Sequence, residues 1–307
     1  MHSLRRGPYR AAVTQRPDDE AFELNERGLA LLDADDLAGA AASFEAALAV
    51  DSSRAAAWYN LGLVHKRRRE WLGSLRCNAE YRRVCRVPLD GDPGMWNLGI
   101  AAVALRDWAT AREAWSAFGI DLPAGSGPVD GPFGFGPIRV NLGAQPEIVW
   151  TRRMNPAQGR IENVPLPTSG RRWHDVLLVD GEPRGERVVA GTTFTVFDEI
   201  EVWESSNVPT LRCAVECKTV DDLNDLLDRF EHAGWGSEDW SESILEVCNE
   251  CSSGRPHRHD DHRANRPWLA EREVGLAADL RAATELLDEW RRERRRGRDF
   301  ERPSRIA

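Results

Sequence analysis

A chain of 307 residues with 41% hydrophobic and 30% charged residues has the composition of a soluble globular protein, and its length favours two or three domains. The formal net charge of −9 excludes attraction of nucleic acid by bulk charge. No apolar run approaches the roughly 18 residues of a membrane-spanning helix, and residues 1–20 lack the apolar segment of a signal peptide. We therefore expect a cytoplasmic protein with a flexible N-terminus over residues 1–20.

The six cysteines are expected to be thiols or metal ligands, because disulfides do not persist in a reducing compartment. The basic residues are almost all arginine, since only Lys66 and Lys218 are lysines. This bias is typical of a GC-rich bacterial genome.

Residues 21–121 contain a pattern that recurs at spacings of 34 and then 37 residues. Each unit has a glycine, a small residue twelve positions later, and a further position four residues on that is aromatic in two of the three units. These positions are Gly28, Ala40 and Phe44, then Gly62, Ser74 and Asn78, then Gly99, Ala111 and Trp115. The spacing predicts two helices per unit that approach closely at the small residues.

The second and third units open with Trp58-Tyr59-Asn60-Leu61-Gly62 and Met95-Trp96-Asn97-Leu98-Gly99. With the small and large residues of the second helix, this pattern resembles the tetratricopeptide repeat (TPR). The resemblance implies an α-solenoid of three helical hairpins that binds polypeptides. Asn78 and Tyr81 depart from the pattern, so the second unit is expected to pack unusually. A generic helical bundle is the alternative.

In tetratricopeptide folds the first helix of each unit lines a concave groove, and the resemblance assigns eight residues to it. They are Asn25, Leu29, Tyr59, Leu63, Lys66, Arg67, Trp96 and Ile100. An apolar strip with a basic edge suits a polypeptide partner that has an apolar anchor and an acidic residue. Alternatively, the groove packs against the chain itself. Asn60 matches an asparagine of members that clamp a carboxylate, but the basic residues of that clamp are not matched in the first unit.

A basic cluster runs from Lys66 to Arg86. Such a run could attract phosphate groups, but Glu70 and Glu80 interrupt it, which favours a solvated helix face. Nucleic acid is therefore not the expected partner.

Residues 122–137 have the composition of a Gly/Pro linker, and residues 138–266 are predicted to form a β-rich α+β domain. Alternating patterns up to residue 218 predict a small barrel or a strongly bent antiparallel sheet. In the last strand, Cys213 and Cys217 share the apolar face, which predicts buried structural thiols. A helix should follow, with Thr219 as its N-cap and Gly234 at its end.

One loop has the residue types of a metal site. Cys248 and Cys251 form a C-x2-C pair, and His257, His259 and His262 follow shortly after. Two thiolates and two imidazoles are the ligands that tetrahedral structural zinc prefers. The separation between the pairs is shorter than in the usual zinc motifs, so an exposed His/Asp-rich loop with an incidental cysteine pair is the alternative.

The C-terminal segment 267–298 is predicted to be an amphipathic helix, followed by a flexible tail over residues 299–307. Its apolar stripe consists of Leu276, Leu280, Ala283, Leu287 and Trp290. The stripe is expected to pack on the β domain or the solenoid, or else on a partner copy.

No catalytic motif is evident, although His174-Asp175 and Asp198-Glu199 lie near strand ends where acid–base groups can sit. The sequence therefore predicts a multi-domain α and α+β protein that acts as an adaptor for a polypeptide partner, and it leaves the oligomeric state open. The alternative is an enzyme or nucleic-acid-processing module in residues 138–266, with the repeats as a targeting device.

Overall fold

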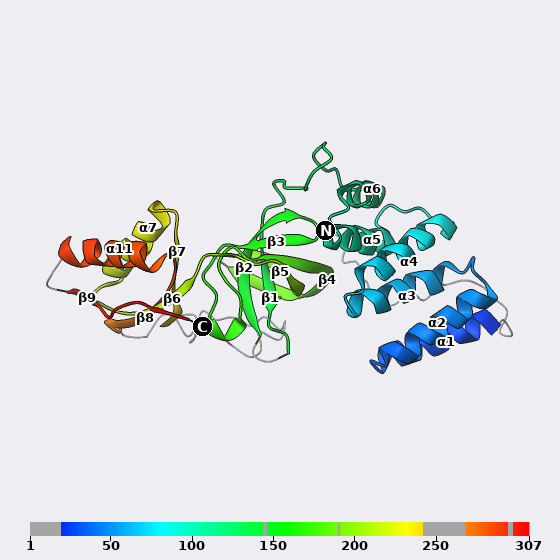
Figure 1. Cartoon of the computed structure of the whole chain (residues 1–307), viewed down its shortest axis with the longest axis horizontal. Coiled ribbons are helices and arrows are strands. Elements are labelled where there is room, and N and C mark those ends of the chain that lie inside the picture. Colours follow the sequence, from blue (N-terminus) through cyan, green and yellow to red (C-terminus); the bar gives the residue numbers. More distant parts are fainter. Residues whose placement is uncertain (1–19, 144–145, 190, 242–267, 294–296, 307) are drawn as a thin grey trace. The chain divides into compact units, whose positions relative to one another are not determined.

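The computed structural model describes residues 20–143, 146–189, 191–241, 268–293 and 297–306. The chain divides into two compact units, Met1–Gly131 and Pro132–Ala307 (Figure 1). The regular elements described in the first unit are helices, whereas the second unit contains two β-sheets and their helices. The described residues form eight α-helices and two sheets, so the protein is of mixed α+β class.

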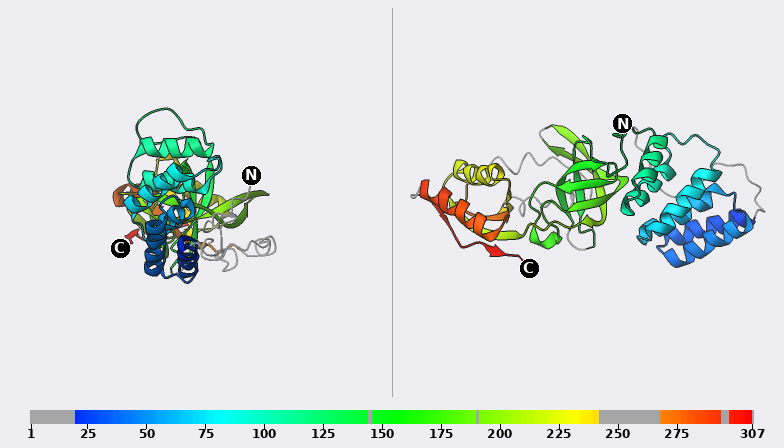
Figure 2. Two further views of the ribbon diagram at one scale, coloured as in Figure 1. Left: turned by 90° about the vertical axis from the view of Figure 1, so that its right-hand side faces the viewer. Right: turned by 45° about the horizontal axis from the view of Figure 1, so that its top comes forward.

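Six helices of the first unit pair into three hairpins. They are α1 Glu20–Asp33, α2 Leu37–Val50, α3 Ala55–Arg67, α4 Trp71–Val84, α5 Pro93–Ala104 and α6 Trp108–Phe118. Each odd-numbered helix packs on the helix that follows it, and α1, α3 and α5 also contact one another in a row. The views in Figure 2 show the hairpins following one another side by side. This arrangement is that of a helical-repeat stack.

The turn inside each hairpin has the same backbone geometry. One left-handed residue recurs at the repeat spacing, namely Asp35 (φ 60°), Arg69 (φ 58°) and Arg106 (φ 60°). The residue after each of them donates its N–H to the carbonyl oxygen five positions earlier, at 2.9, 2.9 and 2.8 Å. These bonds close the carboxyl end of each first helix. The three hairpins are therefore copies of one unit, which is compatible with a TPR-like solenoid.

The glycine of each first helix is required by the second helix of the same hairpin. A Cβ atom built on the glycine would meet the large residue sixteen positions later. The pairs are Gly28 with Phe44 (2.4 Å), Gly62 with Asn78 (2.8 Å) and Gly99 with Trp115 (2.4 Å). Any larger residue would separate the two helices, so these contacts set the packing distance within each hairpin.

Asn78 and Tyr81, which depart from the repeat pattern, are both fully buried. Asn78 donates its side-chain amide to the carbonyl oxygen of Ser74 at 2.8 Å, a hydrogen bond that an aromatic side chain could not make. Tyr81 donates its hydroxyl to Asp92 Oδ2 at 2.6 Å. Because Asp92 is also the N-cap of α5, Tyr81 ties the second hairpin to the start of the third.

The second unit begins with a closed five-stranded barrel, which is one of the two predicted arrangements. Its strands are β1 Phe135–Val140, β2 Glu147–Asn155, β3 Gln158–Ile161, β4 Val176–Val189 and β5 Thr192–Glu204. Consecutive strands pair antiparallel, and β5 closes on β1 in parallel. Ile138, Val149 and Leu177 are among the side chains that fill the interior. A barrel closed in this way has no free edge.

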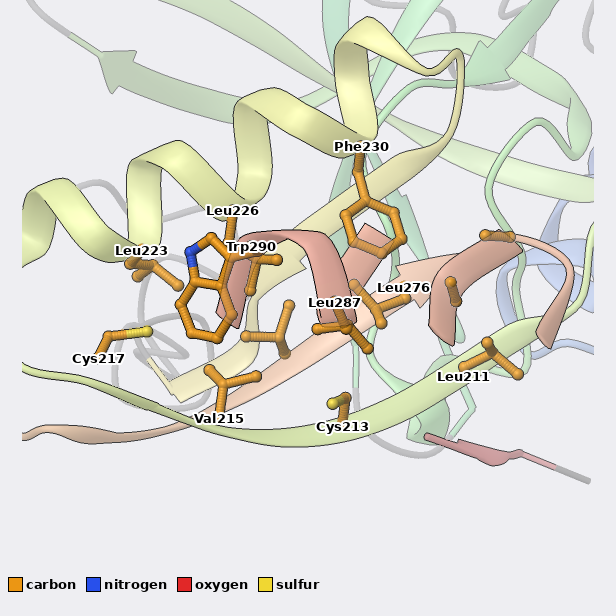
Figure 3. Packing of buried hydrophobic residues seen from close by; sticks show 13 residues of the cluster. Leu211, Cys213, Val215, Cys217, Leu223, Leu226, Phe230, Leu276, Leu287 and Trp290 are labelled. Atoms are coloured by element: carbon orange, nitrogen blue, oxygen red, sulfur yellow. The ribbon is translucent and has the colours of Figure 1, made fainter. Parts of the chain in front are cut away.

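The second sheet has the order β10-β6-β8-β7, with β9 also paired to β6. Its strands are β6 Thr210–Cys217, β7 Gly236–Asp239, β8 Glu271–Ala277, β9 Arg298–Phe300 and β10 Ser304–Arg305. Helices α7 Val220–His232 and α11 Leu280–Glu293 pack on one face (Figure 3). Among the described elements, the order β-α-β-β-α-β, with β8 antiparallel between β6 and β7, is that of split-βαβ folds. The strand β6 therefore starts a new sheet and does not join the barrel strands.

The C-terminal helix is shorter than predicted over residues 267–298. β8 precedes it, α11 begins only at Leu280, and β9 and β10 lie where a flexible tail was expected. Leu276 fits both the helical period and the strand period. It lies four positions before Leu280, and it also shares one face of β8 with Val274, two positions earlier. The prediction was wrong because it assigned this position to the helical period alone.

The core of the second sheet contains Cys213 and Cys217, which are free thiols and 1% and 0% exposed. Burial raises the pKa of each thiol to about 12, so both stay protonated. This confirms the prediction of buried structural thiols. Leu287 and Trp290 of α11 reach the same cluster, as Figure 3 shows. The apolar stripe of α11 is therefore covered within its own unit.

A buried ion pair fixes the end of the chain on this core. Arg298 Nε donates to Asp222 Oδ1 at 2.8 Å, and the two side chains are only 4% and 6% exposed. Arg298 also bonds Asp225 at 2.7 Å and the carbonyl oxygen of Trp290 at 3.2 Å, while Trp290 Nε1 donates to the carbonyl oxygen of Asp222. The network joins α7, α11 and β9. It explains why β9 is ordered although its sequence is polar.

We predict that Arg298→Met lowers the free energy of unfolding by about 3–5 kcal/mol, because it removes the positive charge that faces the buried Asp222 carboxylate. Urea unfolding followed by circular dichroism and tryptophan fluorescence measures the effect. Arg212→Gln is the control, because Arg212 is 53% exposed in its pair with Glu273 and should cost less than about 1 kcal/mol. Equal losses in the two variants would contradict this role of Arg298.

Candidate functional site

A row of polar side chains crosses α1, α3 and α5, which are the first helices of the three hairpins. Asn60 of α3 donates its amide to Asn25 Oδ1 of α1 at 3.2 Å. Lys66 of α3 donates its ammonium to Asn97 Oδ1 of α5 at 3.1 Å. The three asparagines are at most 4% exposed, whereas Lys66 is half-buried. Amides and a cation are thus aligned across α1, α3 and α5.

The structure places the eight predicted groove residues at three different depths. Asn25, Leu29, Tyr59, Leu63 and Ile100 are buried, Lys66 and Trp96 are half-buried, and Arg67 is exposed. Tyr59 and Leu63 belong to a core cluster between α3 and the third hairpin. Trp96 packs edge-on against Phe118, with 5.1 Å between ring centroids. Only three of the eight side chains are therefore accessible to a partner.

Arg67 and Lys66 form the basic end of this row. Arg67 Nη1 donates to the carbonyl oxygen of Leu32 at 3.2 Å and lies 3.9 Å from Asp35 Oδ1. Asn97 was not among the predicted site residues. The sequence does carry a signal for it, since an asparagine precedes Leu-Gly in both the second and the third unit.

The basic cluster further along the chain is largely paired. Arg68 lies 3.9 Å from Glu70, Arg82 lies 3.2 Å from Glu113, and Arg83 lies 2.7 Å from Glu80. These contacts are those of a solvated helix face.

A shallow pocket of about 320 Å³ lies between the α2–α3 connection and the end of α4. It is lined by Ser52, Ser53, Arg83, Val84 and Arg86. Its arginines lie at the carboxyl end of α4, where the helix dipole is unfavourable for an anion.

The predicted metal ligands Cys248, Cys251, His257, His259 and His262 lie outside the described residues. In the sequence they fall between β7 and β8. At the end of β7, Asp239 forms an ion pair with Arg272 of β8. Within the parts of the chain that the structure describes, no group of three or more His, Cys, Asp or Glu side chains is arranged to hold a metal ion.

The carboxylates that the sequence placed near strand ends are held by arginines. Asp198 accepts two hydrogen bonds from Arg139, at 2.8 and 2.9 Å. Glu199 accepts two from Arg171, both at 2.7 Å. The first pair joins β1 to β5, and the second fixes the segment after Ser169 to β5, so both have a structural role.

Asp175 and His174 also have structural partners. Asp175 accepts the backbone N–H groups of Arg172 and Ser206, at 2.8 and 2.7 Å, while burial raises its pKa. The ring of His174 stacks on Trp173, and its Nε2 lies 3.5 Å from Glu162.

Glu147 at the start of β2 is a buried carboxyl group with a raised pKa. Its Oε1 accepts the N–H of Leu166 at 3.0 Å, whereas its buried Oε2 has no hydrogen-bond partner among the described residues. Burial raises the pKa of Glu147 to about 7. Leu166 in turn packs with Val164 against Trp240. Glu147 therefore supports the segment through which the barrel contacts the second sheet.

Comparison with known proteins gives a partial likeness to solved structures. No protein-family model matches the chain, and no curated protein matches it. Among solved structures, YrrB, described as a TPR protein with an unusual peptide-binding site, aligns with 34% of this chain at 23% identity and a TM-score of 0.31. The alignment covers 53% of YrrB, about half of its length. We therefore base the repeat geometry on the turns and the glycine contacts described above.

None of the helices in the described ranges combines the length and the apolar character needed to cross a bilayer.

We predict that Glu147→Gln stabilises the protein at pH 8 by about 2 kcal/mol and has little effect below pH 4.5. A carboxyl whose pKa is raised on folding favours the folded state while protonated, so that stability is lost as pH rises through about 7. Urea unfolding at the two pH values measures the difference. Glu113→Gln alters an exposed carboxyl and should change stability by less than about 0.5 kcal/mol. An equal effect of Glu147→Gln at both pH values would contradict the assignment.

Proposed function

We propose that the repeat unit binds a polypeptide partner through the face shared by α1, α3 and α5, and that the protein acts as a cytoplasmic adaptor. The observation that carries this proposal is that Lys66, Arg67 and Trp96 of this face keep accessible surface, whereas the buried amides of Asn25, Asn60 and Asn97 link the three helices to one another. The face therefore combines two cations with an aromatic ring, which suits an extended chain or a helix that has an acidic residue and an apolar anchor.

The basic end of the row favours an acidic partner. Lys66 is half-buried, the side chain of Arg67 is 45% exposed, and both lie in the last turn of α3. Asp35 lies 3.9 Å from Arg67 and is 88% exposed, so water screens that pair. The half-buried Trp96 supplies an aromatic surface for an apolar anchor of the partner.

The adaptor role is supported by the division of the chain into two units. The α11 stripe is buried in the second unit, so it is not available to cover the helices of the first. One unit can then hold a partner while the other has a separate task.

We predict that the double variant Lys66→Gln/Arg67→Gln captures at least fivefold less of its partner than the wild type does. Tagged full-length protein is incubated with cell extract, and captured proteins are quantified by isotope-labelled mass spectrometry. Arg76→Gln/Arg86→Gln is the matched control, because both arginines are exposed. Arg76 lies in α4, the second helix of the same hairpin, and Arg86 follows the end of that helix. An identical set of captured proteins for all three forms would refute binding at this face.

We also propose that the segment between β7 and β8 binds one structural zinc ion through Cys248, Cys251 and two of His257, His259 and His262. The proposal rests on ligand type and on the position of the segment in the sequence, between two paired strands. Bound zinc would contribute folding free energy to this segment.

Metal analysis of the purified protein should find near one zinc per chain, and Cys248→Ser should lose it. Cys85→Ser is the control, because Cys85 is a half-buried thiol in the first unit, and it should retain the metal. Folded wild-type protein that contains no zinc after purification without chelators would rule the site out.

A further inference from the structure

A small apolar cluster joins the barrel to the second sheet. Its buried members are Val164 and Leu166 from the connection between β3 and β4, Trp240 directly after β7, and Ala277 of β8. We call these four residues the joint, and we call residues 162–169 the clasp segment, because this part of the connection reaches the second sheet. The joint is distinct from the barrel interior and from the core under α7 and α11.

Two tryptophan side chains hold the clasp segment by hydrogen bonds. Trp173 Nε1 donates to the carbonyl oxygen of Glu162 at 3.1 Å. Trp240 Nε1 donates to the carbonyl oxygen of Val164 at 3.0 Å. The backbone of the clasp segment is therefore tied to two aromatic side chains.

Both indole rings lie against glycines of the second sheet. A Cβ atom built on Gly236 of β7 would clash with the ring of Trp173, and one built on Gly275 of β8 would clash with the ring of Trp240. The rings thus fill recesses that only glycine leaves open. Such close packing means that the clasp segment has one seat on the second sheet and leaves it as a whole.

Glu147 at the start of β2 holds the clasp segment from the barrel side. Its Oε1 accepts the N–H of Leu166, whereas its Oε2 is buried without a hydrogen-bond partner among the described residues. When Glu147 is ionised, this oxygen loses its hydration and gains no protein donor in return. The neutral carboxyl group fits the closed joint, and the carboxylate opposes it.

The charged side chains on the neighbouring elements are engaged in ion pairs and do not offset a charge on Glu147. None of them contributes to the shift in the pKa of Glu147. They are Arg139 of β1 with Asp198 of β5, Arg171 with Glu199 of β5, and Glu162 of the clasp segment with Arg160 of β3.

The protonation of Glu147 changes within the physiological pH range. Burial raises its pKa to about 7, although the N–H of Leu166 and the hydroxyl of Ser169 oppose this rise. When the carboxyl group is exposed to water, its pKa returns to the ordinary value of 4.5. The closed joint is therefore most stable below pH 4.5, and it loses stability as the pH rises through about 7.

We propose that ionisation of Glu147 releases the clasp segment and opens the joint between the barrel and the second sheet. The N–H of Leu166 then loses its acceptor, and the clasp segment leaves the indole donors of Trp173 and Trp240. The barrel interior and the core under α7 and α11 take no part in this opening. The joint is thus a pH-sensitive device, independent of binding by the repeat unit.

The test is hydrogen exchange on the nitrogen-15-labelled full chain at pH 6 and pH 8, expressed as protection relative to the intrinsic exchange rate. We expect the amide of Leu166 and the indole N–H of Trp240 to be about tenfold less protected at pH 8, which is the ratio that a pKa of 7 closed and 4.5 open gives. Trp240 is the reporter because His174, which titrates itself, stacks on Trp173.

Two further measurements separate this opening from other events. The most protected amides of β6 report global unfolding, and they should be at least about tenfold more protected than Leu166 at both pH values. The carbon-13 carboxyl signal of Glu147 in the wild type should titrate with a midpoint near 7.

Matched variants assign the pH dependence to one carboxyl group. Glu147→Gln keeps the side-chain shape and the acceptor for Leu166 but cannot ionise, so its protection at Leu166 and Trp240 should be equal at the two pH values within about twofold. Glu113→Gln removes a carboxyl group that is 67% exposed and should change with pH as the wild type does.

Three results would overturn the proposal. The first is equal protection of Leu166 at pH 6 and pH 8 in the wild type, and the second is a titration midpoint of Glu147 near the ordinary 4.5. The third is protection of Leu166 as high as that of the β6 amides, which would mean that the joint opens only when the whole unit unfolds.

Discussion

The close approach of the two helices in each hairpin is the contact on which the repeat unit depends. Each first helix carries a glycine where a large side chain of the second helix lies, and a Cβ atom there would clash. Because the three hairpins share one turn geometry, their first helices line up in a row. Residues at equivalent positions then become neighbours across helices. The bonds of Asn60 to Asn25 and of Lys66 to Asn97 exist only because the unit is repeated.

The same repetition decides how much of the predicted groove a partner can reach. An apolar side chain on the inner face of one hairpin can pack against the next hairpin, and it is then buried and does not line the groove. Tyr59 shows the outcome, since it packs against Tyr81 at 5.6 Å and lies in a core cluster with Met95. Charged residues cannot be buried in this way without a partner, so Lys66 and Arg67 keep their contact with solvent. The accessible part of this face is therefore more polar than the sequence pattern indicates.

Local patterns in the sequence predicted local structure well. The helical period located the hairpins, and the alternation around Cys213 and Cys217 placed both thiols in the core. Contacts between distant residues could not be predicted, because no local pattern encodes them. Arg139 and Asp198 are 59 positions apart, and Arg298 and Asp222 are 76 apart. The same reason explains the error at Leu276, whose strand is recognisable only by its pairing with β6.

Net charge is a poor guide to what this protein can bind. At physiological salt the Debye length is about 8 Å, so a carboxylate in contact with the surface senses the nearest groups and little of the rest. The end of α3 is one place with accessible cations, since the side chain of Arg67 is 45% exposed and Lys66 is half-buried. A short acidic segment meets only such a place. A long polyanion extends beyond it and is repelled by the remaining surface of a chain with a charge of −9. The acidic composition therefore does not oppose acidic partners as a class, but it selects short segments over long polyanions.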